Sequence, residues 1–183
     1  ACTKLDAIDR LVTVLAPDRV EKATTAGEFL AIHGRHKLAV AIGIENGFSI
    51  AKDLGRLTIA KQRGAIYFGL THNGHNDLAD SAIPLANLND RPEEHGGLSE
   101  LGRQAIAECN RLGILVDVAH ASRNATLQTC ELSKAPVITS HTGCRTLADT
   151  PRNVDDDCLQ AIAKTGGVAS ITALPLCLGR DPE

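Results

Sequence analysis

The chain contains no methionine and no tryptophan, and its 183 residues include only one tyrosine and three phenylalanines. It lacks an apolar run long enough for a transmembrane helix. Its first residues, ACTKLDAIDR, are polar and helix-like rather than typical of a signal peptide. We therefore expect no membrane segment in this chain, and these features favour a cytoplasmic protein. Because the chain starts at Ala1 without methionine, we expect its N-terminus to be missing, which leaves an export signal further upstream open.

An excess of positive charge is also absent, since the formal net charge is −3 at pH 7. This balance gives no reason to expect nucleic acid or an anionic membrane as a partner. The hydrophobic fraction of 43% and the charged fraction of 22% are ordinary for a globular protein. A chain of this length can bury a sizeable core, so we expect residues 1–183 to form a single domain.

The six cysteines include no C-x-x-C pair, which argues against zinc-finger and thioredoxin-like proteins. Cys109, Cys130 and Cys158 fall among apolar neighbours in segments with helical periodicity. The sequence therefore predicts reduced and mostly buried thiols rather than a disulfide framework.

Short apolar runs alternate with amphipathic segments along most of the chain. The runs predict strands at 38–45, 65–71, 114–119, 136–140 and 168–174, with a shorter extended segment at 19–23. The amphipathic segments predict helices at 4–15, 24–33, 49–62, 99–112, 123–132 and 153–165, capped in part by Ser99, Ser122 and Asn153. Residues 72–97 form a long polar connection. This order of strands and helices predicts an α/β fold with a parallel sheet.

Four of the predicted strands end in a carboxylate or an imidazole, which are Glu45, His72, His120 and His141. Ligands of parallel β/α folds bind outside the carboxyl ends of the strands. A single histidine there is more often a hydrogen-bonded structural residue, but four such side chains at equivalent positions predict a common site. Carboxylate oxygen and neutral imidazole nitrogen are ligands that suit zinc.

Other polar residues near these strands have different predicted roles. Asp117 lies within its strand and could support a ligand from behind. His33, His36 and His95 lie in polar sequence and are expected to be solvated, whereas His75 in the loop after the second of the four strands is ambiguous.

Five collinear stretches of the chain resemble the membrane (renal-type) dipeptidases, metallopeptidase family M19 of the amidohydrolase-like superfamily. They are GIENGFSI (43–50), YFGLTHNGHNDLADSA (67–82), GLSELGRQAIAECNRLGILVDVAHAS (97–122), APVITSH (135–141) and PRNVDDDCLQAIAKTGGV (151–168). The resemblance implies a TIM-type (β/α)8 barrel. A complete barrel typically needs about 250 residues, so this chain would supply roughly strands two to six of an incomplete barrel.

The same resemblance implies a zinc-dependent dipeptidase that hydrolyses dipeptides through a hydroxide bridging two metal ions, and inactivity of this segment alone stays open. Glu45 would be the catalytic bridging ligand, with His120 and His141 completing the one metal site encoded here. His72 would contact the substrate at the scissile group as a second catalytic residue. Arg152 would bind the dipeptide carboxylate, since its planar guanidinium matches a carboxylate in two-point contact. A homodimer is one candidate assembly.

The chain departs from the family pattern at several positions. No strand with the His-x-Asp pair of the first metal site precedes Glu45, and the Asp-bearing last strand would lie beyond Glu183. Leu78 replaces a residue that is usually aromatic, and residues 172–174 replace a Tyr-containing run. Two alternatives therefore stay open: another amidohydrolase acting on lactones, β-lactams or amides, and a non-catalytic metal-binding fragment. Arg152 could instead merely offset Asp155, Asp156 and Asp157.

Overall fold

The computed structural model describes residues 2–179, and its main element is a curved sheet of five parallel strands in the order β3-β4-β5-β6-β7. The strands are β3 (Ile42–Ile44), β4 (Ala65–Gly69), β5 (Leu115–Asp117), β6 (Val137–Thr142) and β7 (Val168–Ile171). Each strand pairs with the next one along the chain, as expected for successive β/α units. The predicted parallel α/β fold is confirmed, and the sheet forms an open arc rather than a closed barrel.

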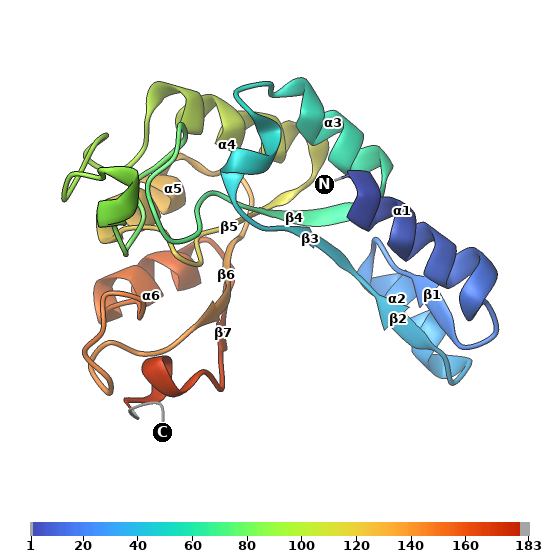
Figure 1. Cartoon of the computed structure of the whole chain (residues 1–183). Helices are drawn as coiled ribbons and strands as arrows, with labels where there is room; N and C mark the ends of the chain where they lie inside the picture. The colour runs from blue at the N-terminus through green and yellow to red at the C-terminus, as the bar shows by residue number, and fades with distance from the viewer. Residues whose placement is uncertain (1, 180–183) are drawn as a thin grey trace.

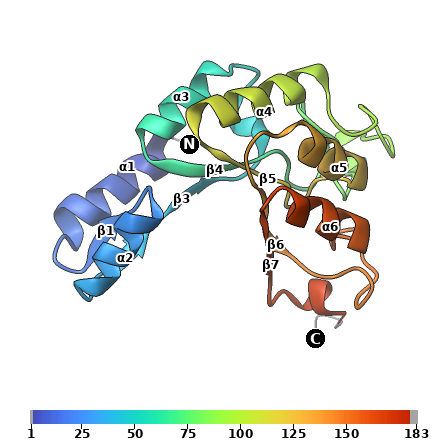
Figure 2. The same ribbon diagram turned by 180° about the vertical axis from the view of Figure 1, so that it is seen from behind.

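Helices cover the outer side of this arc. The helices are α1 (Cys2–Arg10), α2 (Ala26–Gly34), α3 (Gly55–Gln62), α4 (Glu100–Leu112), α5 (Arg123–Leu132) and α6 (Asp156–Lys164). Figures 1 and 2 show α3, α4, α5 and α6 along the convex side, whereas the inner side between β3 and β7 carries no helix. This is the one-sided arrangement of a barrel segment, in which the inner side of the strands belongs to the barrel interior.

The segment 38–45 is not one strand, as its apolar run predicted, but two strands in different sheets. β2 (Leu38–Val40) pairs in parallel with β1 (Val20–Lys22), whereas β3 pairs with β4. Ala23 N donates to Val40 O and extends the first pairing, and the chain then turns so that Ile42 is buried at 3% exposure. Apolar periodicity cannot locate this break, because both strands have apolar residues.

The caps predicted at Ser99 and Ser122 are confirmed, since their hydroxyls accept hydrogen bonds from Gly102 N and Ala125 N. The cap predicted at Asn153 is wrong, and Asp155 begins α6 by accepting from Cys158 N at 2.8 Å. Asn153 is buried instead. Its amide donates to the carbonyls of Ala148 and Cys177, where it fastens the loop after β6.

The helix predicted at 49–62 begins later than its periodicity indicated. A short 3-10 helix (Gly47–Ile50) comes first, and α3 starts only at Gly55. Ala51 and Lys52 have φ values of 46° and 66°, so the chain is left-handed between the two helices. The predicted strands 65–71 and 168–174 are also shorter and end at Gly69 and Ile171.

The core lies between the strands and the outer helices. Its largest fully buried side chains include Phe68, Leu70, Val116, Val118 and Val137 from the sheet region, packed with Leu57, Ile106 and Ile162 from the helices. Cys109 and Cys158 are buried, and no disulfide forms among the five cysteines whose side chains the structure describes. Within residues 2–179, none of the helices combines the length and apolarity that a membrane crossing requires. This packing holds the carboxyl ends of the strands in a fixed arrangement.

Candidate metal centre

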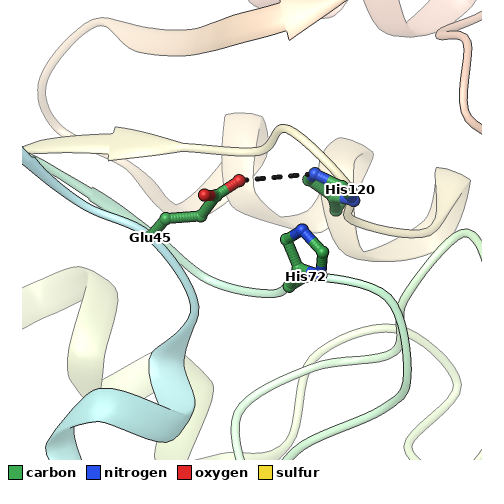
Figure 3. Close-up of side chains that lie close together, drawn as sticks. All are labelled: Glu45, His72 and His120. Carbon is green, nitrogen blue, oxygen red and sulfur yellow. Dashed lines mark ion pairs between the residues drawn. The ribbon is translucent and has the colours of Figure 1, made fainter.

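The four side chains predicted from the strand ends lie at one edge of the sheet. Glu45 directly follows β3, His72 and His120 lie in the loops after β4 and β5, and His141 lies near the end of β6. Figure 3 shows Glu45, His72 and His120 pointing toward one another from these segments. The parallel strands thus bring together residues that are up to 96 positions apart in the chain (45 to 141).

Glu45, His120 and His141 form a nearly equilateral triangle of ligand atoms. Glu45 Oε1 lies 3.4 Å from Nε2 of His120 and 3.4 Å from Nε2 of His141. The two Nε2 atoms are 3.1 Å apart. Tetrahedral zinc with bonds of about 2.0–2.1 Å requires ligand atoms about 3.3 Å apart, so these three atoms fit one face of a zinc tetrahedron.

His120 is held from behind. Its Nδ1 lies 2.9 Å from Oδ1 of Asn73, so Nδ1 carries the proton and Nε2 keeps a lone pair facing Glu45. Burial lowers the pKa of His120 to about 3, with further contributions from Arg152, His72 and His141. The residue also has a φ of 67°, which is uncommon outside glycine and occurs at functional sites. A neutral imidazole with a fixed tautomer is the form that binds a metal ion.

His141 has a similar support. Its Nδ1 lies 2.8 Å from Oγ of Ser140, and that hydroxyl donates to Asp117 Oδ2. The supporting position considered for Asp117 therefore exists, with Ser140 between the carboxylate and the ring. With both rings protonated at Nδ1, the lone pairs of the two Nε2 atoms face each other at 3.1 Å, and a cation between them relieves this repulsion.

His72 lies beside the triangle rather than in it. Its side chain is exposed, and its ring centroid is 4.1 Å from that of His120 with an interplanar angle of 32°. Ligand atoms of Glu45, His72 and His120 also lie within 4.8 Å of one another, so two possible ligand triads share Glu45 and His120. The triad with His141 is favoured because Nε2 of His141 lies 3.4 Å from Glu45 Oε1 and 3.1 Å from Nε2 of His120, close to the spacing of ligand atoms around tetrahedral zinc.

Arg152 is buried at 5% exposure next to the histidines. Its Nη2 donates to the carbonyl of His141 at 2.8 Å. Burial lowers the pKa of Arg152, an effect that the charges near it partly offset. Among residues 2–179 its guanidinium forms no ion pair. Asp155 and Asp157 pair with Arg123 instead, so Arg152 forms no ion pair with these two aspartates.

The loop 72–97 is ordered by polar residues that the sequence did not single out. Asp80 is fully buried and accepts hydrogen bonds from the backbone of Glu94, His95 and Gly97. These hydrogen bonds lower the pKa of Asp80 although burial opposes its ionisation. A single Asp between Ala79 and Ser81 is a weak signal of such a role, because its partners lie 14–17 residues away.

Two histidines of this loop are structural. His95, expected to be solvated, is half-buried, and its Nε2 lies 2.8 Å from Asn76 O. The side chain of His75 is 1% exposed and its Nδ1 accepts from Ser81 N. His33 and His36 are exposed, as predicted. Asn73 and Ser140 were also missed, since nothing in the sequence indicates which ring nitrogen each would contact.

Comparisons with known proteins find a matching family and several similar proteins. A model of the family described as Membrane dipeptidase (Peptidase family M19) matches residues 2–183. Dipeptidase verJ of Clonostachys rogersoniana is 36% identical over 155 residues, which are 85% of this chain and 38% of that protein. Mouse (Mus musculus) Dipeptidase 3 is 34% identical over 172 residues, 94% of this chain and 34% of its own length.

A crystal structure of the probable dipeptidase PvdM from Pseudomonas aeruginosa has the same fold. Its TM-score to this chain is 0.89 at 35% sequence identity, and the matched part covers 95% of this chain and 44% of that one. The chain thus spans between about a third and about half of the length of these relatives.

Proposed function

This chain belongs to the membrane dipeptidase family, peptidase family M19, and we propose that its metal centre hydrolyses the peptide bond of dipeptides. The observation that carries the proposal is the triangle formed by Glu45 Oε1 and the Nε2 atoms of His120 and His141. Three protein ligands with an open fourth position are typical of catalytic rather than structural zinc.

Glu45, His120 and His141 would hold the metal, and zinc is the ion that their donor atoms favour. In the complete enzyme a second ion would share Glu45. When bound, the zinc pair supplies Lewis-acid polarisation of the scissile carbonyl and a hydroxide nucleophile at neutral pH. Glu45 is 49% exposed at the edge of the sheet, so a second oxygen of its carboxylate is accessible for such sharing.

His72 would act on the substrate rather than on the metal. Its exposed ring stacks on His120 and so lies beside the open position of the triangle. From there an imidazole N–H can donate a hydrogen bond to the oxygen that becomes negative as the carbonyl is attacked. The exposed ring has room for a substrate, which supports this role over a structural one.

Arg152 would bind the free carboxylate of a dipeptide. A buried guanidinium without an ion-pair partner in the described part of the chain is costly unless an anion completes its hydrogen bonds. Within residues 2–179 its side chain donates one hydrogen bond, to the carbonyl of the proposed ligand His141. Four of its N–H groups remain available for a planar, two-point contact with a carboxylate. This arrangement favours substrates whose carboxylate lies close to the scissile bond.

The test compares a dipeptide with the corresponding dipeptide amide in the Arg152→Ala variant of the complete enzyme. Loss of a charge-assisted pair in a partly desolvated site costs about 2–5 kcal/mol, so kcat/KM for the dipeptide should fall by roughly 30-fold or more. The amide, which lacks the carboxylate, should be much less affected, and zinc content should not change. Arg145→Ala is the matched control, since Arg145 lies in the same loop but is exposed and pairs with Asp149.

If Arg152→Ala lowers kcat/KM equally for the dipeptide and its amide, Arg152 does not bind the substrate carboxylate. The broader activity of an amidohydrolase on lactones, β-lactams or other amides would then explain the site better. A protein that binds zinc in the triangle but cleaves none of these substrates would be a non-catalytic metal-binding protein.

A further inference from the structure

The strand that carries His141 is irregular where the ligand emerges. Thr139 pairs with Ala169 of β7, but Thr142 pairs with Ile171, so β6 advances three residues while β7 advances two. The extra residue places a β-bulge at Ser140 and His141. A bulge redirects side chains and leaves backbone groups without partners in the ladder. The orientation of His141 therefore depends on what stabilises this bulge.

Asp117 provides hydrogen-bond acceptors for the groups of Ser140 at this bulge. This carboxylate is 2% exposed, and its Oδ1 accepts hydrogen bonds from Ala119 N and Ser140 N, both at 2.9 Å. Its Oδ2 accepts from Ser140 Oγ at 2.5 Å. Asp117 thus joins the end of β5 to the bulge of β6. A buried carboxylate with three donors is a fixed point from which the neighbouring groups are oriented.

The hydrogen bond between Ser140 and Asp117 also determines the direction of the hydrogen bond between Ser140 and His141. Because the Ser140 hydroxyl donates its only proton to Asp117, it can only accept from His141 Nδ1, which must then carry a hydrogen. The proton is thereby kept off Nε2, the atom that faces Glu45. The side chain of His141 is 37% exposed, so packing alone does not hold the ring.

We infer that Asp117 is a positioning residue for the metal centre, acting through the bulge and the Ser140 hydroxyl to fix the Nδ1–H tautomer of His141. This inference rests on the proposed metal site, but its first readout requires neither metal nor substrate. It predicts that a change at Asp117 alters the proton position on a ring that Asp117 does not touch. A merely structural carboxylate would lower stability without that effect.

Asp117→Asn gives the sharpest test, because the orientation of the new amide is forced. Its oxygen must take the Oδ1 position, where two backbone N–H groups donate, so its NH2 group faces Ser140 Oγ. The hydroxyl then accepts from the amide and donates its own proton to His141 Nδ1. The expected result is a switch of His141 to the Nε2–H tautomer, whereas Ser140→Ala should give a mixture of both tautomers.

The tautomer is read in the isotope-labelled, metal-free protein by proton–nitrogen correlation spectra of the imidazole rings at about pH 8, where free histidines are neutral. Zinc affinity is measured separately by competition with a chromophoric chelator. Asp117→Asn and Ser140→Ala should each weaken zinc binding by about 10- to 100-fold. Ser140→Thr, which keeps the hydroxyl, should have the wild-type tautomer of His141 and the wild-type zinc affinity.

Ser133→Ala is the matched control. Ser133 also has a half-buried hydroxyl in a small network, with Asn110 and Ala135 O, but it lies before the opposite end of β6. It should leave the tautomer of His141 and zinc affinity unchanged. The inference is overturned if wild-type His141 carries its proton on Nε2, or if Asp117→Asn leaves the ring as in wild type. A protein that shows the tautomer switch but cleaves no dipeptide would contradict the proposed function alone.

Discussion

The individual residues of the centre are oriented by partners on the side away from the metal position. Asn73 fixes the Nδ1–H of His120, and Ser140 does the same for His141. The sequence indicated Glu45, His72, His120 and His141 because each ends a predicted strand. It could not indicate Asn73 or Ser140, since their importance depends on which ring atom they contact, and hydrogen-bond distances are not encoded by periodicity.

A comparison of two histidine variants distinguishes the overlapping ligand triads. His72→Ala should retain zinc but lower kcat by about 10²- to 10³-fold, the typical cost of removing one donor to a developing oxyanion. His120→Ala should lose zinc as well as activity. Metal analysis of both variants is the measurement, with the exposed His33→Ala as the control. Zinc lost from His72→Ala would make His72 a ligand, and equal zinc in wild type and His120→Ala would remove His120 from the ligand set.

At the scale of elements, helices were easier to predict than strand limits. The Ser-capped helices α4 and α5 combine a cap, an apolar face and a defined start, and these three signals agree. The segment 38–45 gave only one signal, apolarity, which is shared by the two strands β2 and β3. The start of α6 was misplaced because Asn153 and Asp155 are both good caps, and only tertiary contacts of Asn153 decide between them.

The cap of α6 gives a prediction for stability. Asp155→Ala should destabilise the protein by about 1–2 kcal/mol in urea unfolding, the usual cost of losing an N-cap. Asp155→Asn should cost less, because asparagine also caps and the partly exposed ion pair with Arg123 contributes only about 0.2–1 kcal/mol. Equal losses of stability in Asp155→Asn and Asp155→Ala would show that the ion pair, which both variants lose, matters more than the cap.

The difference between wild type and Asp155→Asn should also depend on pH. Burial opposes ionisation of Asp155, but the Cys158 N–H and Arg123 outweigh it and lower its pKa. A lowered pKa stabilises the folded state above the unfolded value of about 3.9, and this stabilisation is lost as the pH falls through the folded pKa. The two unfolding free energies should therefore converge below about pH 4.

At the scale of the whole molecule, the chain contains an arc of four β/α units and a final strand, and its proposed ligands lie directly after β3, in β6 and in the loop after β5. Val168 and Ile171 of the last strand are 60% and 58% exposed, although strands of a closed barrel are covered on both sides. The parallel order of the strands followed from the sequence. The curvature of the arc did not, because it arises from packing between units.

The most direct test of the central claim is the release of free amino acids from a dipeptide by the purified complete enzyme, measured with zinc, after chelation, and in His120→Ala. We predict hydrolysis by the zinc-loaded enzyme, loss of the activity on chelation, and recovery when zinc is added back. His120→Ala should remain inactive at the same zinc concentration, with a rate at least about 100-fold lower. An intact dipeptide in the presence of the zinc-loaded wild type, or equal rates of dipeptide hydrolysis in wild type and His120→Ala, would contradict the proposed zinc-dependent dipeptidase activity.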